Sequence, residues 1–369
     1  MTILIDLTSL ADNFSGIERY AACLVLELIK NRNNDYILCF KGKVHMLFES
    51  VSKQENVKTV IIEACKKLLF NQVKLPLVIR KYRADYYLFL AFPVPWLLWK
   101  KNMVSTIHDI CCWDCPETMN GMSKWYFRIS HRLAMLKCSN IITISKFSEQ
   151  RISERLNYDA NKIWLIYCGI DDKFNTFIED KGGQENIKKK YNLPDKYILS
   201  LSTLEPRKNL QLLVKAYRKL VLRGDMSISL VLAGRKGWKL DALLNGIEQS
   251  VKEQIYFTGF IADEDLPDVY GNATLFVFPS KYEGFGMPPL EAMACGTPVL
   301  SSDASSLSEV LGDAALYFKN EDDSDLTMGL LRAISLNAEE IKRLILEGKK
   351  QSEKFSWAVE AKKIESRMR

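Results

Sequence analysis

Two carboxylates, Glu283 and Glu291, stand eight positions apart in the most distinctive segment of the chain, residues 276–298. An apolar run in this segment ends at Pro279, and the glycines at 284 and 286 would let the backbone approach a ligand closely. Prolines at 288 and 289 preset φ for a helix start, and N–H groups at such a start suit phosphate oxygens or sugar hydroxyls. The pattern therefore predicts a ligand site whose carboxylates accept hydrogen bonds from two different sugar rings.

A pair of cations, Arg207 and Lys208, follows the apolar run 197–202. The helix dipole disfavours cations at a helix start, so a functional role is favoured over a solvated helix end. Placed after a strand, these side chains can reach the ligand site and balance the negative charge of phosphate groups.

Three further residues lie where a strand gives way to a loop or a helix. Gly16 precedes the amphipathic stretch 17–30, and its missing side chain would let the helix start approach phosphates and a sugar. His108 ends the run 104–107, and a neutral imidazole near pH 7 donates or accepts a hydrogen bond. Asp109 would orient His108 or an acceptor. A turn glycine and a core histidine remain as the alternatives.

Metal chemistry is not expected. The triplets Asp263-Glu-Asp265 and Asp323-Ser-Asp325 precede amphipathic stretches, which is typical of helix caps and first-turn acids. Cys112 and Cys115 have zinc-like spacing, but no second cysteine or histidine pair follows at the right distance. We therefore predict a site that works without a metal or other cofactor.

Apolar runs alternate with helical patterns through both halves of the chain. The predicted strands are 2–7, 36–40, 57–62, 104–107, 140–145, 162–167, 197–202, 227–233, 254–258, 274–278 and 298–301. The predicted helices are 17–30, 124–137, 146–156, 208–222, 263–272 and 288–294. Strands that are apolar throughout indicate parallel sheets covered on both faces, with ligands at the carboxyl ends of the strands. We predict an α/β protein of two doubly wound, Rossmann-like domains that face a cleft, separated in the polar stretch 172–195.

Composition is that of an ordinary folded protein. The 369 residues are 47% apolar and 26% charged, and the formal charge of +6 is too small for a general nucleic-acid binder. Nine cysteines, an odd number, lie mostly within apolar runs and suggest buried reduced thiols. The first residues lack a basic n-region, and no window reaches the roughly 18 apolar residues of a spanning helix. We expect a cytoplasmic protein.

The motifs taken in order resemble the GT4 family of retaining glycosyltransferases, which have the GT-B fold. Glu283 and Glu291 match the family's E-x7-E signature. The other matching motifs are Ser15-Gly16-Ile17-Glu18-Arg19-Tyr20, His108-Asp109, Glu205-Pro-Arg207-Lys208-Asn209, Ala233-Gly234-Arg235, Thr258-Gly259-Phe260 and Ser301-Ser-Asp303. The resemblance covers roughly residues 1–318. It implies an acceptor-binding domain at 1–175, a nucleotide-sugar-binding domain at 190–350, and a C-terminal helix at 351–369 that packs back on the first domain.

The resemblance also implies roles for individual residues. Glu291 would hold the nucleotide ribose, Glu283 the hexose, and His108 the hexose near the reacting carbon. The remaining donor-binding residues are Gly16, Arg207 and Lys208 near the phosphates, the N–H groups of Phe285, Gly286 and Met287, and Gly234, Arg235, Phe260 and Ile261 near the base. Glu283 would position and stabilise rather than attack, and the departing phosphate would take the proton of the acceptor.

The implied function is hexose transfer, with retention and without a metal, in bacterial surface-polysaccharide synthesis such as O-antigen or capsule. The donor would be a GDP- or UDP-sugar, with mannose from GDP-mannose as the first guess, and the acceptor a lipid-linked or oligosaccharide glycan. Two other functions stay open: a nucleotide-sugar epimerase or hydrolase of the same fold, and a binding-only scaffold. Intact Glu283, Glu291, Arg207 and Lys208 argue against the scaffold.

Residues 65–101 carry eight Lys or Arg against a single acid, Asp85, together with Trp96 and Trp99. A basic stretch with tryptophans suits the headgroup layer of an anionic membrane. The segment therefore suggests peripheral contact with the cytoplasmic face of the inner membrane, and the alternative is a solvated helix face with a buried Trp.

Overall fold

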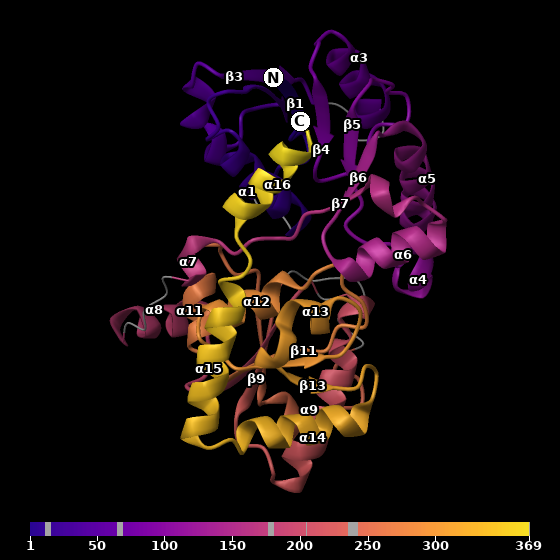
Figure 1. Ribbon diagram of the computed structural model, residues 1–369. Helices are drawn as coiled ribbons and strands as arrows, with labels where there is room; N and C mark the ends of the chain where they lie inside the picture. Colours follow the sequence, from indigo (N-terminus) through magenta and orange to yellow (C-terminus); the bar gives the residue numbers. More distant parts are fainter. Residues whose placement is uncertain (12–15, 65–68, 176–180, 204, 235–242, 369) are drawn as a thin grey trace. The chain divides into compact units, whose positions relative to one another are not determined.

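The computed structural model describes residues 1–369 except 12–15, 65–68, 176–180, 204, 235–242 and 369, and for 181–184 it describes the backbone only. The chain divides into two compact units. The first comprises Met1–Gly169 and Ser356–Arg369, and the second comprises Ile170–Phe355. Each unit holds one parallel β-sheet with helices packed on it (Figure 1).

The first unit is built on a seven-stranded sheet of order β3-β2-β1-β4-β5-β6-β7, in which neighbouring strands are parallel. Its strands are β1 Thr2–Asp6, β2 Asp35–Lys41, β3 Val57–Ile62, β4 Tyr86–Phe89, β5 Met103–Thr106, β6 Asn140–Thr143 and β7 Ile163–Leu165. Its α-helices are α1 Gly16–Leu28, α3 Leu75–Arg80, α4 Cys111–Asp114, α5 Gly121–Lys137, α6 Lys146–Leu156 and α16 Trp357–Arg367. Short turns of other helix types are η1 Met46–Phe48, η2 Val51–Lys53, η3 Phe70–Lys74, η4 Pro116–Thr118 and η5 Ala160–Lys162.

Local sequence explains where these elements begin and end. The side chain of Ser145 accepts a hydrogen bond from the Ser148 N–H at the start of α6, and Asn157 ends that helix with φ 52°. Asn120 caps α5 in the same way by accepting from the Ser123 N–H at 2.8 Å. Polar caps of this kind satisfy N–H groups that have no partner inside the helix.

The second unit is built on a six-stranded parallel sheet of order β10-β9-β8-β11-β12-β13. Its strands are β8 Tyr197–Leu201, β9 Ser229–Ala233, β10 Ile255–Gly259, β11 Leu275–Phe278, β12 Val299–Ser302 and β13 Leu316–Phe318. Its helices are α7 Asp172–Asn175, α8 Lys181–Tyr191, α9 Leu210–Arg223, α10 Gln249–Lys252, α11 Leu266–Gly271, α12 Met287–Ala294, α13 Leu307–Leu311, α14 Asp323–Ile334 and α15 Ala338–Ser352, with short turns η6 Pro206–Lys208 and η8 Gly312–Ala314.

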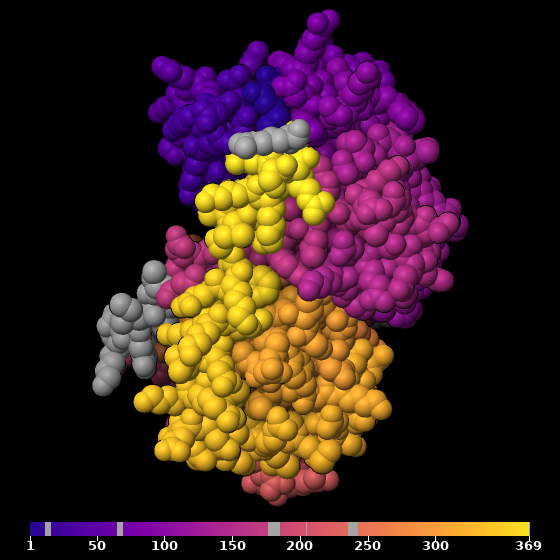
Figure 2. Space-filling view, viewed as in Figure 1, coloured from indigo at the N-terminus to yellow at the C-terminus, as the bar shows by residue number. Residues whose placement is uncertain are grey.

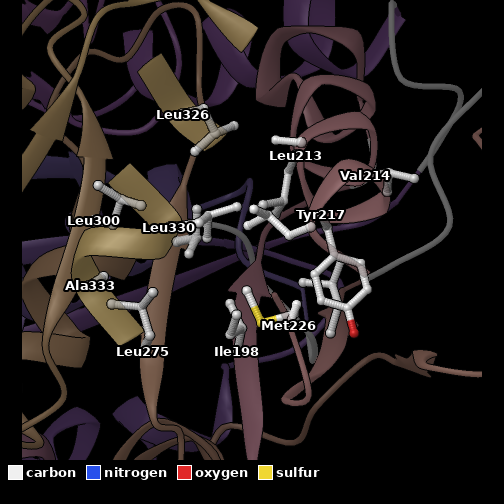
Figure 3. Close-up of a cluster of buried hydrophobic side chains, with 14 of the residues drawn as sticks. Ile198, Leu213, Val214, Tyr217, Met226, Leu275, Leu300, Leu326, Leu330 and Ala333 are labelled. Carbon is white, nitrogen blue, oxygen red and sulfur yellow. The ribbon is translucent and has the colours of Figure 1, made fainter. Parts of the chain in front are cut away.

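A continuous apolar core lies on one face of the second sheet (Figure 3). Helix α9 contributes the fully buried Leu213 and Tyr217, and α14 contributes Leu330, against strand residues such as Ile198. Each such leucine gains about 1.5–3 kcal/mol from leaving water, so burial holds the sheet and the loops that follow its strands in place.

The predicted fold class, two parallel Rossmann-like sheets with helices, is confirmed. The helix predicted to start at Lys208 begins instead at Leu210, because Pro206–Lys208 form a tight turn and Asn209 adopts φ 53°. Strands β4 and β13 and helix α3 were not among the predicted elements. Helix α16 belongs to the first unit, where it contacts α1 beside the indigo N-terminal residues (Figures 1 and 2).

Among the described residues, no helix combines the length and apolar character that crossing a bilayer requires.

Candidate active site

The order of the strands in the second unit creates a topological switch point between β8 and β11. From β8 the chain builds outward through β9 and β10, and then returns to add β11 on the other side of β8. Loops that follow the two central strands diverge there, which leaves a crevice at the carboxyl ends of the strands in open α/β sheets. Arg207 and Lys208 follow β8, and Ser280 and Glu283 follow β11, so four polar side chains meet at this point.

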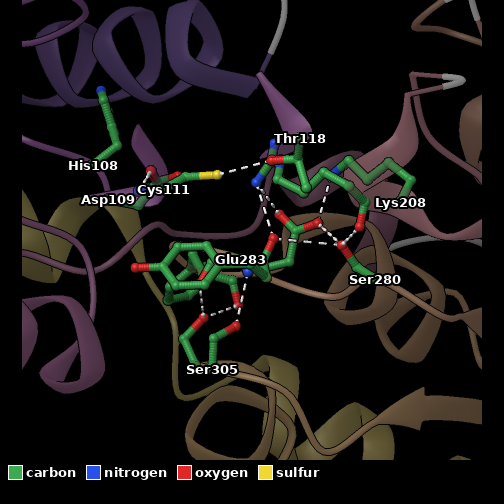
Figure 4. A network of polar contacts seen from close by, with 12 residues as sticks. His108, Asp109, Cys111, Thr118, Lys208, Ser280, Glu283 and Ser305 are labelled. Carbon is green, nitrogen blue, oxygen red and sulfur yellow. Dashed lines mark hydrogen bonds and ion pairs between the residues drawn. The ribbon is translucent and has the colours of Figure 1, made fainter. Parts of the chain in front are cut away.

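Glu283 is the centre of a buried charge cluster (Figure 4). Its Oε1 accepts hydrogen bonds from Lys208 Nζ and Ser280 Oγ, both at 2.5 Å. Its Oε2 lies 3.4 Å from Arg207 Nη1, which also donates to the Tyr282 carbonyl at 3.0 Å. The side chains of Lys208 and Glu283 are only 12% and 9% exposed, so their charges interact in a medium that screens them far less than water.

The cluster holds Glu283 ionised although it is buried. Burial acts to raise the pKa of the Glu283 carboxyl, but the Lys208 and Arg207 cations and the hydrogen bonds from Lys208 and Ser280 outweigh it and hold the pKa below its ordinary value. Burial lowers the pKa of the Lys208 ammonium, and Glu283 offsets this only in part. Two cations therefore contact the Glu283 carboxylate at the strand ends.

Two consecutive serines hold the loop that carries Glu283 through hydrogen bonds to its main chain. Ser305 Oγ accepts from the Glu283 backbone N–H at 2.8 Å, and Ser306 Oγ donates to the carbonyls of Glu283 and Phe285 at 3.0 and 3.1 Å. The backbone of Ser305 has φ 54°, a left-handed conformation that residues other than Gly and Asn rarely adopt. The strained residue thus lies where it sets the position of the central carboxylate.

Gly286 makes the turn into α12 possible. Its φ is 103°, and a Cβ there would lie 2.6 Å from Leu307 Cδ2. Met287 begins α12, while the Phe285 ring is buried and packs edge-on against Phe355 with ring centroids 5.4 Å apart. The main chain of the predicted loop is therefore at a helix start, as the sequence indicated, whereas the Phe285 side chain is a packing residue.

Glu291 lies on α12 and is 6% exposed. Its Oε2 accepts a hydrogen bond from the Tyr270 hydroxyl at 2.8 Å. Tyr270 comes from α11, so a second helix holds the carboxylate. Different side chains thus hold the two signature carboxylates in these contacts: Lys208 and Ser280 at Glu283, and Tyr270 at Glu291.

The residues predicted to lie near a base have mixed surroundings. Gly234 follows β9 with φ 135°, and a Cβ on it would lie 1.9 Å from the Ser202 carbonyl oxygen, so close packing of two strand ends requires this glycine. Phe260 is 45% exposed, whereas the Ile261 side chain is buried and can offer only its backbone. Arg235 lies outside the described residues.

The predicted residues of the first unit lie at the carboxyl ends of its strands. His108 follows β5, and its Nε2–H donates to the Leu90 carbonyl, which follows β4, at 3.1 Å. Burial lowers the pKa of His108 to about 4, so the ring is neutral near pH 7, as predicted. Asp109 Oδ1 accepts from the Cys111 N–H at 2.8 Å, and Gly16 is the first residue of α1.

The acidic triplets and the cysteine pair are accounted for by local structure. The side chain of Asp322 caps α14, with Asp323 and Asp325 in its first turn, while Asp263 and Asp265 pair with Lys173 and Lys190. Cys112 Sγ lies 3.8 Å from His131 Nδ1. No group of three or more His, Cys, Asp or Glu side chains is arranged as metal ligands in the part of the chain that the structure describes.

Four residues of the site were absent from the sequence prediction: Ser280, Ser305, Ser306 and Tyr270. Single serines and tyrosines carry no spacing signal, and their partners lie 3 to 23 positions away. The one available hint was that Ser305 and Ser306 follow the matched Ser301-Ser-Asp303 motif at a strand end.

Comparison with known proteins gives a consistent result over both units. Residues 14–174 match the model of "Glycosyltransferase Family 4", and residues 183–351 match that of "Glycosyl transferases group 1". The chain is 32% identical to O-antigen chain mannosyltransferase B of Escherichia coli in an alignment of length 364 that covers 93% of this chain and 93% of that one. It is 36% identical over 271 residues to the serotype-specific mannosyltransferase WbdA of Escherichia coli, covering 72% of this chain but only 32% of WbdA.

A solved structure shares the fold. HepE of Anabaena, crystallised in complex with UDP-glucose, superposes with a TM-score of 0.74 over 100% of this chain and 99% of that one, at 17% sequence identity. The order of the motifs, the two parallel sheets and the relative that covers 93% of the chain all indicate the same family. The chain therefore belongs to the GT4 glycosyltransferases, with the GT-B fold.

Proposed function

We propose that this protein transfers mannose from a nucleotide sugar, with GDP-mannose as the first choice, to a lipid-linked or oligosaccharide acceptor during O-antigen synthesis. The relative that covers 93% of the chain is an O-antigen chain mannosyltransferase, and the superposed HepE structure holds UDP-glucose. The observation that carries the proposal is the cluster of Arg207, Lys208 and Glu283 at the β8/β11 switch point.

The cluster supports departure of a nucleoside diphosphate. Negative charge that develops on the leaving phosphate would be stabilised by the cations of Arg207 and Lys208, which lie side by side at Glu283. Fixed donors of this kind are worth several kcal/mol where water is excluded, because they need no reorganisation during the reaction. In this proposal the two cations supply the charge that a metal ion would otherwise supply.

The geometry of Glu283 supports retention without a covalent glycosyl-enzyme. Both of its oxygens accept hydrogen bonds or contact a cation, and its lowered pKa reflects a carboxylate stabilised in place. Such a carboxylate is a weak nucleophile. We assign it to positioning the hexose, with attack by the acceptor on the same face from which the diphosphate leaves and proton transfer to the departing phosphate.

Thermal shift with GDP-mannose and matched UDP-, dTDP- and ADP-sugars tests the donor. A ligand at about a hundred times its dissociation constant adds ~2.7 kcal/mol of stability. We expect the shift with GDP-mannose and none with K208M, which removes a proposed phosphate contact. A shift with another sugar nucleotide alone would redirect the donor assignment.

Turnover on a synthetic lipid-linked mannoside, followed by NMR of the anomeric proton, tests transfer and stereochemistry. We expect an α-linked product from the α-configured donor, at a rate unchanged by EDTA. Free mannose without acceptor transfer would indicate a hydrolase, an altered sugar nucleotide an epimerase, and binding with no turnover a scaffold.

A further inference from the structure

Helix α5 turns its apolar side toward solvent. Met122, Trp125, Ile129, Arg132 and Leu136 follow one another at intervals of three or four residues, so they form one stripe along the helix, and all five are exposed. Met122, Trp125 and Leu136 are 86%, 63% and 70% exposed. The buried residues of α5 are instead small or polar, namely Ser130, His131 and Ala134, and the larger Tyr126, Phe127 and Met135 are half-buried beside them.

This arrangement differs from that of an ordinary surface helix, whose apolar residues face the core and whose exposed side is charged. The helix contains no acidic residue in its 17 positions, whereas its bases are Lys124, Arg128, Arg132 and Lys137. Figure 1 shows α5 along the outer margin of the first unit.

A second exposed apolar group adjoins the end of α5. Lys137 Nζ lies 4.7 Å above the Trp99 ring and donates to the Trp96 carbonyl, which joins the helix to the loop before β5. Trp99 and Leu97 in this loop are 59% and 56% exposed. The loop is joined in turn to α3, because Arg80 donates to the Leu97 carbonyl at 2.7 Å.

The two tryptophans of the loop differ in role. Trp96 donates through Nε1 to Ser130 Oγ at 2.9 Å and stacks on Tyr126 with ring centroids 5.6 Å apart, so it fastens the loop to α5. Trp99 is the ring that faces outward. Residues 65–101, which the sequence indicated as a membrane contact, thus supply only part of this surface, and Lys66 and Lys67 lie outside the described residues.

We propose that the α5 stripe, together with Leu97 and Trp99, is a docking surface for an anionic phospholipid bilayer. Exposed tryptophans beside aliphatic side chains suit the headgroup layer, and bases without acids suit its negative charge. A symmetric contact with a second copy would instead set the bases of one α5 against those of the other, which is unfavourable. The proposal extends the proposed function by holding the enzyme where a lipid-linked acceptor resides.

Sedimentation with vesicles tests the surface in the full-length protein without donor or acceptor, so it can fail while transferase activity stands. We expect binding to phosphatidylcholine vesicles that contain phosphatidylglycerol, weakened by salt, and little binding to phosphatidylcholine alone. The variant W125E/L136E should reduce partitioning at least about tenfold, because it loses two apolar anchors and adds two negative charges.

The matched control is M328E/L346E on the second unit. Its two side chains are 60% and 53% exposed, and it makes the same change in net charge. It should bind vesicles like the parent protein. The charge-neutral W125Q/L136Q should lose part of the binding, and circular dichroism should show that all variants are folded. Each of four results would overturn the proposal. They are an equal loss of binding in both acidic variants, binding that does not depend on phosphatidylglycerol, no binding by the parent protein, and a dimer in light scattering that W125E/L136E abolishes.

Discussion

Replacing Lys208 with Met should lower the stability of the second unit by about 3 kcal/mol, because it leaves the buried Glu283 carboxylate without its nearest cation. The pair is joined at 2.5 Å, and neither side chain is more than 12% exposed. Arg207 remains at 3.4 Å and compensates only in part. E283Q should cost a similar amount for the converse reason. The double variant K208M/E283Q should be less damaged than the sum of the two by about 2 kcal/mol.

Hydrogen exchange on peptides from β8 and β11 is the suitable assay, since it reports the opening free energy of the second unit separately from the first. The pair Lys281–Glu321 in the same unit is the control, with side chains 31% and 57% exposed. Its cycle, K281M, E321Q and the double variant, should give a coupling below about 1 kcal/mol, as for other surface pairs. If the Lys208 and Glu283 effects added to within about 0.5 kcal/mol, the reasoning from burial and pairing would be refuted.

Three shorter predictions concern other residues. S305G removes the Oγ that accepts a hydrogen bond from the Glu283 N–H, but glycine adopts the left-handed backbone without strain, so turnover should fall about tenfold with an unchanged melting temperature. S305A should lower both turnover and the melting temperature. Full activity in S305G would contradict a positioning role for Ser305. G234A should lose more than about 3 kcal/mol in urea unfolding, because its Cβ would meet the Ser202 carbonyl at 1.9 Å, and a stability close to the parent's would argue against that contact. The pKa of His108 is lowered from 6.5 to about 4, so between these values the unfolded state binds a proton that the folded state does not, and this group should make the protein less stable as pH falls through that window. An NMR titration of the His108 ring that shows protonation near pH 6.5 would contradict this last prediction.

Periodic and spaced features of the sequence were sufficient for the fold class, and they named Arg207, Lys208 and Glu283, which the structure brings together. Apolar runs predicted most strands of both sheets. The bounds of α6 were predicted correctly, and Ser145 and Asn157 are typical helix caps at its two ends. The loop from 283 to 287 was also predicted, since glycines and prolines carry strong local preferences. These signals depend on neighbours within a few positions, which is why a linear reading finds them.

Partnerships across the chain were decided only by the tertiary structure. The sequence indicated Lys208 and Glu283 as site residues but did not show that they form a pair. They meet only because the chain returns from β10 to place β11 beside β8, which brings position 283 next to position 208. It likewise did not show that Ser305 supports Glu283, or that Tyr270 holds Glu291.

The exposed side of α5 was also decided by the tertiary structure and not by the sequence. Its sequence holds apolar residues on two sides, and periodicity cannot tell which side faces the protein. Packing settled the matter through Ser130, His131 and Ala134, which left the tryptophan and its neighbours outside. Residue types and short spacings thus determined which elements form and which polar groups follow the strands. The folded chain decided which of these groups meet, since burial and long-range pairing are properties of the whole sheet.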